Sequence, residues 1–131
     1  MQDTPDDVSV VLVGHCGPDT WMIRNAVERA LPGVAVEMVT EQAQLASHLK
    51  PGRVLLLNRQ LDGVFDAGLG QELIAPALAG GAVPLLVSNF EDAQQAAVAA
   101  GAHQGFGKSA VNDEATGDVL RAAALKAGGP V

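Results

Sequence analysis

The residues of this chain that could do chemistry come directly after apolar runs. One run ends at Asn58, and another ends at Ser88. A third run is followed by Gly14 and His15, and Lys108 comes just after a fourth. If the runs are parallel strands, their carboxyl ends share one edge of a sheet, where open α/β sheets bind ligands. The pattern therefore predicts one polar site built from these five residues.

The chemistry of this predicted site is limited because none of the five residues carries a carboxylate. Phosphoryl transfer needs an anionic oxygen as nucleophile and a divalent cation that offsets the charge of the phosphoryl oxygens. Mg²⁺ prefers hard anionic oxygens, so Gly14, His15 and Asn58 would leave it dependent on water and backbone carbonyls. We expect no metal, no cofactor and no enzymatic activity. The donors of Ser88 and Lys108 could instead meet an anionic ligand.

Predicted strands and helices alternate along the chain and would hold these five residues in place. Apolar or alternating runs predict strands, and apolar residues at helical spacing that end at Gly or Pro predict helices. We expect strands at 8–13, 34–39, 53–58, 83–88 and 103–106 and helices at 18–31, 40–49, 71–78, 91–100 and 113–126. Connections this short require right-handed crossovers. The predicted fold class is α/β, a doubly wound, flavodoxin-like (βα)5 fold whose five parallel strands lie in the order 2-1-3-4-5.

Length and composition predict one domain with one core. The chain has 131 residues, of which 48% are apolar, and this size suits a single domain. We expect a receiver-like unit at 8–127 between an acidic flexible tail at 1–7 and a C-terminal tail at 128–131, with no output domain after it unless the chain is a piece of a longer protein. Cys16 is the sole cysteine, so no internal disulfide can form, and a small buried side chain is expected.

Charge and hydropathy exclude two classes of partner. Eight basic and fifteen acidic side chains give a formal net charge of -7, and no Lys or Arg cluster offers a track for phosphates, so we expect no nucleic acid partner. The first residues lack the features of a signal peptide, and no apolar run approaches the roughly 20 residues of a membrane span. We expect a cytoplasmic protein that does not bind membranes.

A family resemblance is carried by Ser88, Lys108 and the segment Ala100-Gly101-Ala102, which comes six residues before the lysine. With the order of elements, these positions resemble the receiver (CheY-like) domain of bacterial two-component response regulators over nearly the whole chain. In that family, two acids after the first strand and an aspartate ending the third strand hold Mg²⁺, and the aspartate accepts a phosphoryl group. A hydroxyl on the fourth strand and a lysine complete the pocket.

Three of these five features are missing here. Gly14 and His15 stand in place of the acid pair, and Asn58 stands in place of the acceptor. The resemblance therefore implies a degenerate phosphorylation pocket in which Ser88 and Lys108 remain. Without the acids, we expect Lys108 to interact at most with Asn58 and Ser88 and to be partly exposed to solvent.

The switch that the family uses is also altered. The family commonly has an aromatic residue three positions before the lysine, where this chain has Gly105. Phe106 follows, and strand alternation predicts that it points to the opposite side of the sheet. Ser109 comes after the lysine, where the family usually has Pro. We therefore expect neither the phosphoacceptor nor the relay to operate.

Several other signals have simpler interpretations. Residues 102–109 are similar to a nucleotide-binding phosphate loop, but Ala102 replaces the first glycine and the segment follows a helix, so we interpret it as a strand and turn. His15 and Cys16 are neighbours that point to opposite sides of a strand, which makes a catalytic pair a poor interpretation. Asp19 and Asp62 could substitute as phosphoacceptor or metal ligand, but without a paired acid we expect solvated loop carboxylates.

Three aromatic residues are candidate partner contacts: Trp21, Phe90 and Phe106. Trp21 lies off the apolar stripe of the first helix, so its ring is either an interface anchor or a cover over the neighbouring helix. Phe90 follows the fourth strand, in a region that receiver domains generally use to meet partners. An unidentified signalling protein is the expected partner, and a homodimer is left open.

The favoured hypothesis is a pseudo-receiver, meaning a receiver-like domain that acts without being phosphorylated, as a protein-protein interaction module in two-component or phosphorelay signal transduction. One alternative is a small-molecule domain that binds an anionic ligand in the crevice at the carboxyl ends of the strands. Another is a residual phosphoacceptor receiver that uses Asp62.

Overall fold

The computed structural model describes residues 8–128, in which strands and helices alternate as the sequence predicts. The strands are β1 (Ser9–Val13), β2 (Ala35–Val39), β3 (Arg53–Asn58), β4 (Val83–Val87) and β5 (His103–Phe106). The α-helices are α1 (Gly17–Ala30), α2 (Gln42–Leu45), α3 (Ile74–Ala79), α4 (Glu91–Ala99) and α5 (Glu114–Ala127). The 3-10 helices are η1 (Ala46–His48), η2 (Gly70–Leu73) and η3 (Lys108–Ala110). The predicted tails at 1–7 and 129–131 lie outside the described residues.

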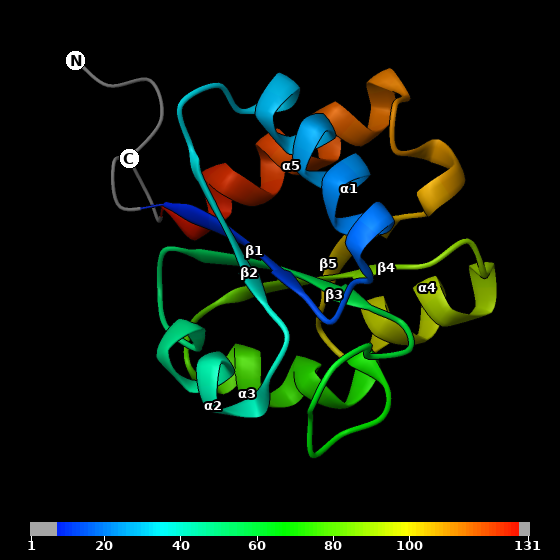
Figure 1. The fold of residues 1–131 in the computed structure, drawn as a ribbon. Helices are drawn as coiled ribbons and strands as arrows, with labels where there is room; N and C mark the ends of the chain where they lie inside the picture. Colours follow the sequence, from blue (N-terminus) through cyan, green and yellow to red (C-terminus); the bar gives the residue numbers. More distant parts are fainter. Residues whose placement is uncertain (1–7, 129–131) are drawn as a thin grey trace.

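The five strands form one parallel sheet in the order β2-β1-β3-β4-β5. This confirms the predicted fold class and strand order. Helices α1 and α5 cover one face of the sheet, and α2, α3 and α4 cover the other (Figure 1). Because β3 lies in the middle, its carboxyl end at Asn58 lies between the loops that follow β1 and β4.

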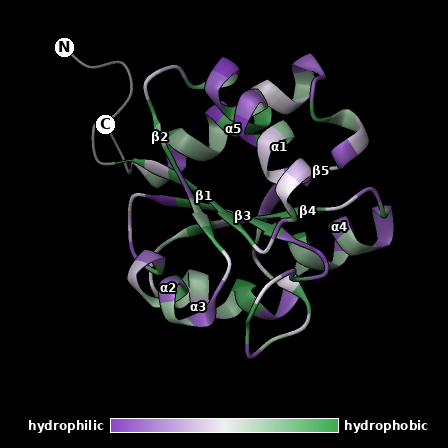
Figure 2. Ribbon diagram, in the orientation of Figure 1, coloured by the Kyte–Doolittle hydropathy of each residue, from purple (hydrophilic) through white to green (hydrophobic). Residues whose placement is uncertain are grey.

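The core consists of two apolar layers, one on each face of the sheet. In β3, Val54 and Leu56 pack in the layer under α1 and α5, and Leu55 and Leu57 pack in the layer under α2, α3 and α4. These four side chains are fully buried. The central strands are therefore hydrophobic along their length (Figure 2), as expected for a parallel sheet that helices cover on both faces.

Two predicted helices are shorter than expected. The helix predicted at 40–49 is a single α-turn, α2, followed by η1, and only Leu45 of these two elements is buried. So little apolar burial cannot stabilise a longer helix. The helix predicted at 71–78 begins as η2 and becomes α-helical only at Ile74. Pro76 therefore falls in the first turn of α3, where its missing N–H does no harm.

None of the helices within residues 8–128 combines the length and the apolar character that crossing a membrane requires.

Candidate functional site

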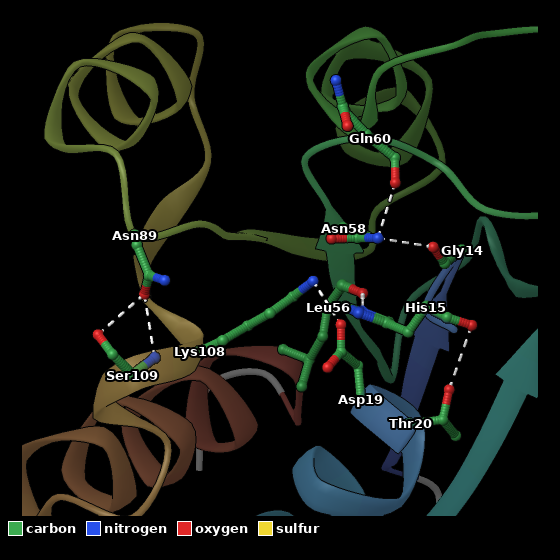
Figure 3. A network of polar contacts seen from close by, with 10 residues as sticks. All are labelled: Gly14, His15, Asp19, Thr20, Leu56, Asn58, Gln60, Asn89, Lys108 and Ser109. Atoms are coloured by element: carbon green, nitrogen blue, oxygen red, sulfur yellow. Dashed lines mark hydrogen bonds and ion pairs between the residues drawn. The ribbon is translucent and has the colours of Figure 1, made fainter. Parts of the chain in front are cut away.

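The loops after β3 and β4 enclose a cavity of about 310 Å³ at the carboxyl edge of the sheet. Its lining residues are Asn58, Arg59, Gln60, Val87, Ser88, Asn89, Phe90 and Lys108. The structure thus brings together three of the five residues predicted for the site, namely Asn58, Ser88 and Lys108. Gly14 and His15 do not line this cavity, although both lie next to it in the structure (Figure 3).

Gly14 supports the site through its backbone. Its φ of 73° lies in the left-handed region, which glycine adopts without strain, and a Cβ here would lie 2.7 Å from Cδ2 of Leu61. The tight turn directs the Gly14 carbonyl oxygen towards Asn58, whose Nδ2 lies 2.9 Å away. A residue with a side chain would disturb this close approach.

Asn58 donates both of its amide hydrogens to backbone carbonyls. Its Nδ2 lies 2.9 Å from the oxygen of Gly14 and 2.7 Å from the oxygen of Gln60 (Figure 3). Carbonyl oxygens only accept hydrogen bonds, so this pair fixes which end of the amide faces them. An ionised carboxylate in place of the amide would present oxygen to both acceptors. The surroundings of Asn58 therefore select an amide over the acid that phosphorylation would need.

His15 is buried under the site, with 4% of its surface exposed. Its Nε2 lies 2.8 Å from the carbonyl oxygen of Leu56, to which it must donate, while its buried Nδ1 has no partner among residues 8–128. Burial lowers the pKa of His15 from 6.5 to about 4, and the nearby charge of Lys108 acts in the same direction. His15 is therefore neutral near pH 7, and its N–H holds the start of α1 to β3.

Lys108 makes an ion pair that the sequence analysis did not predict. Its Nζ lies 2.7 Å from Oδ2 of Asp19 in the first turn of α1 (Figure 3). The expectation that Lys108 interacts at most with Asn58 and Ser88 is therefore wrong, and so is the interpretation of Asp19 as a solvated loop carboxylate. The hydrogen bond from Lys108 lowers the pKa of Asp19. Asp19 lies outside the cavity lining, so it does not replace an acid beside Asn58.

The loop after β4 is held by hydrogen bonds, and two of them come from Ser109, the residue that replaces the family's usual proline. Ser88 Oγ accepts the backbone N–H of Phe90 at 3.0 Å. Asn89 Oδ1 accepts both the backbone N–H and the hydroxyl of Ser109, each at 3.0 Å (Figure 3). A proline at position 109 has no N–H to donate. Ser109 therefore ties the loop after β5 to the loop after β4.

Gln94 fills the space beside Gly105, where the family commonly has an aromatic side chain. Its Nε2 lies 2.9 Å from the carbonyl oxygen of Leu86, 3.1 Å from that of Ser88 and 3.2 Å from that of Phe106. These carbonyls lie at the register shift between β4 and β5. A Cβ on Gly105 would lie 2.0 Å from the Leu86 oxygen and 2.9 Å from Gln94 Oε1. Sequence reasoning missed Gln94, whose only signal is its amide among the alanines of α4.

The candidate partner contacts differ in exposure. Phe106 is 6% exposed and packs in the core under α1 and α5, so its prediction as a partner contact is wrong. Trp21 is 70% exposed, which excludes a ring laid over the neighbouring helix, and Phe90 is 59% exposed. The Arg59 guanidinium lies over the Phe90 ring, 4.7 Å from its centroid.

The sequence analysis expects Cys16 to be a small buried side chain. In the structure Cys16 is half-buried rather than fully buried.

The cavity does not fit the magnesium ion that the family resemblance implies. No carboxylate lines it, and the Gly14 carbonyl, a remaining oxygen ligand, already accepts from Asn58. Within residues 8–128, no three side chains of the His, Cys, Asp or Glu type are placed to share a metal. Mg²⁺ requires hard oxygen ligands, and Arg59 and Lys108 would repel it.

Comparisons with known proteins identify the fold. No protein-family model matches the sequence, and no curated protein matches it. Among solved structures, the signal receiver domain of a DNA-binding response regulator from Colwellia psychrerythraea 34H is similar, with a TM-score of 0.65 and 18% identity over 88% of this chain and 96% of that one. A response regulator receiver domain from Rhodospirillum rubrum has a TM-score of 0.59 and 16% identity, over 91% of this chain and 92% of that one.

A response regulator from Burkholderia pseudomallei is similar over 95% of this chain and 76% of that one, with a TM-score of 0.55 and 19% identity. That protein holds a phosphorylated aspartic acid, a calcium ion and citrate. At these levels of identity the comparisons establish the fold alone. This chain has the fold of response regulator receiver domains.

Proposed function

We propose that this chain is a pseudo-receiver that acts in bacterial signal transduction by binding another protein, without being phosphorylated and without catalysing a reaction. The observation that carries the proposal is the amide of Asn58, which donates to the carbonyls of Gly14 and Gln60 at the position where a receiver has its acceptor. A receiver-fold domain that lacks the acceptor has binding as its remaining route of action.

The chemistry of the site supports the absence of phosphorylation. Attack on a phosphodonor requires an ionised oxygen, and an amide supplies none. The same reaction needs a divalent cation, and the cavity instead presents Arg59 and Lys108. Asp62 is a poor substitute acceptor because its residue is exposed and lies outside the cavity lining.

The groups that a receiver moves on phosphorylation already have partners here. Ser88 accepts from the backbone of Phe90, and Lys108 is paired with Asp19. Gln94 occupies the place of the switch aromatic and joins β4 to β5. These interactions hold the three groups in the positions that the structure shows, so we expect one constitutive state and a surface that is always ready to bind.

Trp21 and Phe90 are the residues through which we propose that binding occurs. Large exposed aromatic side chains are common anchors of protein interfaces, and these two are exposed at 70% and 59%. An alternative is that the domain serves a small anionic ligand in the cavity described above, which the donors of Ser88 and Lys108 favour.

The test is affinity capture from the native cell with the tagged chain, with and without a small phosphodonor and Mg²⁺. A partner captured equally in both conditions, and lost with Trp21→Ala or Phe90→Ala, is the expected result. Leu125→Ala is a matched control because Leu125 is 58% exposed on α5. Capture that depends on the phosphodonor, or that neither aromatic substitution affects, would contradict the proposal.

A further inference from the structure

We infer that the cavity between the loops after β3 and β4 is a reversible binding site for a phosphate group, carried either as inorganic phosphate or as a phosphate monoester. The inference goes beyond the proposed function because it needs no acceptor residue and no covalent bond. It depends on Arg59 and Asn89, which the sequence analysis did not select, together with Ser88 and Lys108.

Arg59 provides the principal charge of this site. Its guanidinium stacks over the Phe90 ring at 4.7 Å, and it makes no hydrogen bond or ion pair with any other residue in the described part of the chain. This cation–π contact holds the guanidinium over the ring and uses none of its N–H groups. These donors form a fork that matches two oxygens of an oxyanion. The exposed Phe90 thus has a local role as a platform for Arg59.

Three further side chains offer donors to the same cavity. Asn89 uses its carbonyl oxygen for Ser109, and its amide nitrogen is directed towards the space between the two loops (Figure 3). Ser88 Oγ accepts from the Phe90 N–H, which leaves its own hydrogen available. Lys108 uses one donor for Asp19 and retains two, because an ammonium group carries three.

The charge balance of the lining favours an anion. Two cations and no carboxylate line the cavity, in a chain whose formal net charge is -7. The lining offers one side-chain acceptor that is directed into this space, Asn58 Oδ1 (Figure 3). The donors come from the loops after three different strands, which suits a tetrahedral oxyanion with three or four oxygens better than a planar carboxylate. A volume of about 310 Å³ accommodates a small phosphorylated molecule.

The experiment is a titration of the whole chain with inorganic phosphate and with phenyl phosphate at constant ionic strength, followed by the backbone ¹H–¹⁵N NMR signals. We expect saturable shifts that centre on residues 58–60, 88–90 and 108, and that dialysis reverses. Arg59→Gln should weaken binding about tenfold or more, because hydrogen bonds to a charged group are lost. Arg24→Gln is the matched control, since Arg24 is an exposed arginine paired with Glu28 on α1.

Asn89→Ala, which keeps both cations, should also weaken binding, by a smaller factor. Signals outside the cavity report whether each variant retains the fold, so a loss of binding is not confused with unfolding. Shifts that do not saturate, or equal effects of Arg59→Gln and Arg24→Gln, would overturn the site. Acetate that binds as tightly as phosphate would overturn the assignment to phosphate. Failure of this titration would refute this inference but leave the proposed function standing. Covalent phosphorylation of the chain would refute the proposed function but not this inference.

Discussion

The side-chain amide of Asn58 donates to the backbone carbonyl of Gly14, which links the end of β3 to the turn after β1 at 2.9 Å. A second bond, to the carbonyl of Gln60, uses the other hydrogen of the same amide. Asn58 is 8% exposed, so water cannot easily replace either partner. The residue at the acceptor position is thus a structural donor that joins three segments of the site.

Replacing the amide with an acid should therefore destabilise the domain rather than restore a receiver. Asn58→Asp loses both hydrogen bonds, each worth about 0.5–1.5 kcal/mol, and turns carboxylate oxygens towards the carbonyl oxygens of Gly14 and Gln60. We expect the free energy of unfolding at neutral pH to fall by about 2–4 kcal/mol, measured by urea denaturation. The matched control is Asn112→Asp, at an exposed residue whose oxygen accepts from Arg29, and it should leave stability nearly unchanged. Equal stability of Asn58→Asp and the wild type would refute the role of the amide.

His15 should make the stability of the domain depend on pH between about 4 and 6.5. Its pKa in the folded state is about 4 because of burial, below the value of 6.5 that applies when it is unfolded. The unfolded chain therefore binds more protons in this range, so stability is complete above pH 6.5 and declines as the pH falls towards 4. The difference corresponds to about 3 kcal/mol.

The measurement for His15 is urea denaturation across this pH range for the wild type and for His15→Gln. Glutamine keeps an N–H donor for the Leu56 carbonyl but does not titrate, so the variant should lose most of the pH dependence. The same dependence in both proteins would show that another group causes it.

The Asp19–Lys108 ion pair should act at lower pH and with a smaller effect. The pKa of Asp19 is lowered from 3.8, chiefly by the Lys108 hydrogen bond, so the stabilisation is present above pH 3.8 and lost as the pH falls through the folded-state pKa. Both side chains are near 30% exposed, which limits the pair to about 1 kcal/mol or less. A double-mutant cycle of Asp19→Asn and Lys108→Met at neutral pH should give a coupling of that size. A coupling well above about 1 kcal/mol, or one of unfavourable sign, would contradict this description of the pair.

The packing of Gln94 against Gly105 gives a prediction about the altered switch. Gly105→Ala places a Cβ 2.0 Å from the Leu86 oxygen, and overpacking of this kind costs about 1–3 kcal/mol. Gly17→Ala is the control, because a Cβ at Gly17 meets nothing within 4 Å, and it should be neutral or slightly stabilising. Thermal unfolding of both variants measures the difference. A Gly105→Ala variant as stable as Gly17→Ala would show that β5 can move away from β4.

The sequence predicted the fold because its signals are local. The run at Val54 to Leu57 is apolar on both faces since helices cover both sides of the sheet, and short connections restrict the strand order. Alternation also placed Phe106 correctly on the face opposite Gly105. It does not reveal that α1 and α5 cover that face, which is why the prediction of Phe106 as a surface contact is wrong.

The contacts of the site could be predicted only in part because they join distant segments. Asp19 and Lys108 are 89 residues apart, and nothing in the sequence near either one identifies its partner. The bonds of Asn58 involve backbone carbonyls, whose directions leave no trace in the pattern of side chains. Gln94 likewise bonds backbone carbonyls at a register shift between β4 and β5, which residue types alone do not reveal.

The cavity beside Asn58 lacks the acidic oxygens that phosphorylation and magnesium binding require. The most direct measurement is the intact mass of the wild-type chain and of Asp62→Ala after incubation with a small phosphodonor and Mg²⁺, beside a receiver domain that has its aspartate. We predict that only the aspartate-containing domain gains a phosphoryl group. A gain of one phosphoryl group on this chain would contradict the account, and its loss in Asp62→Ala would identify Asp62 as the acceptor.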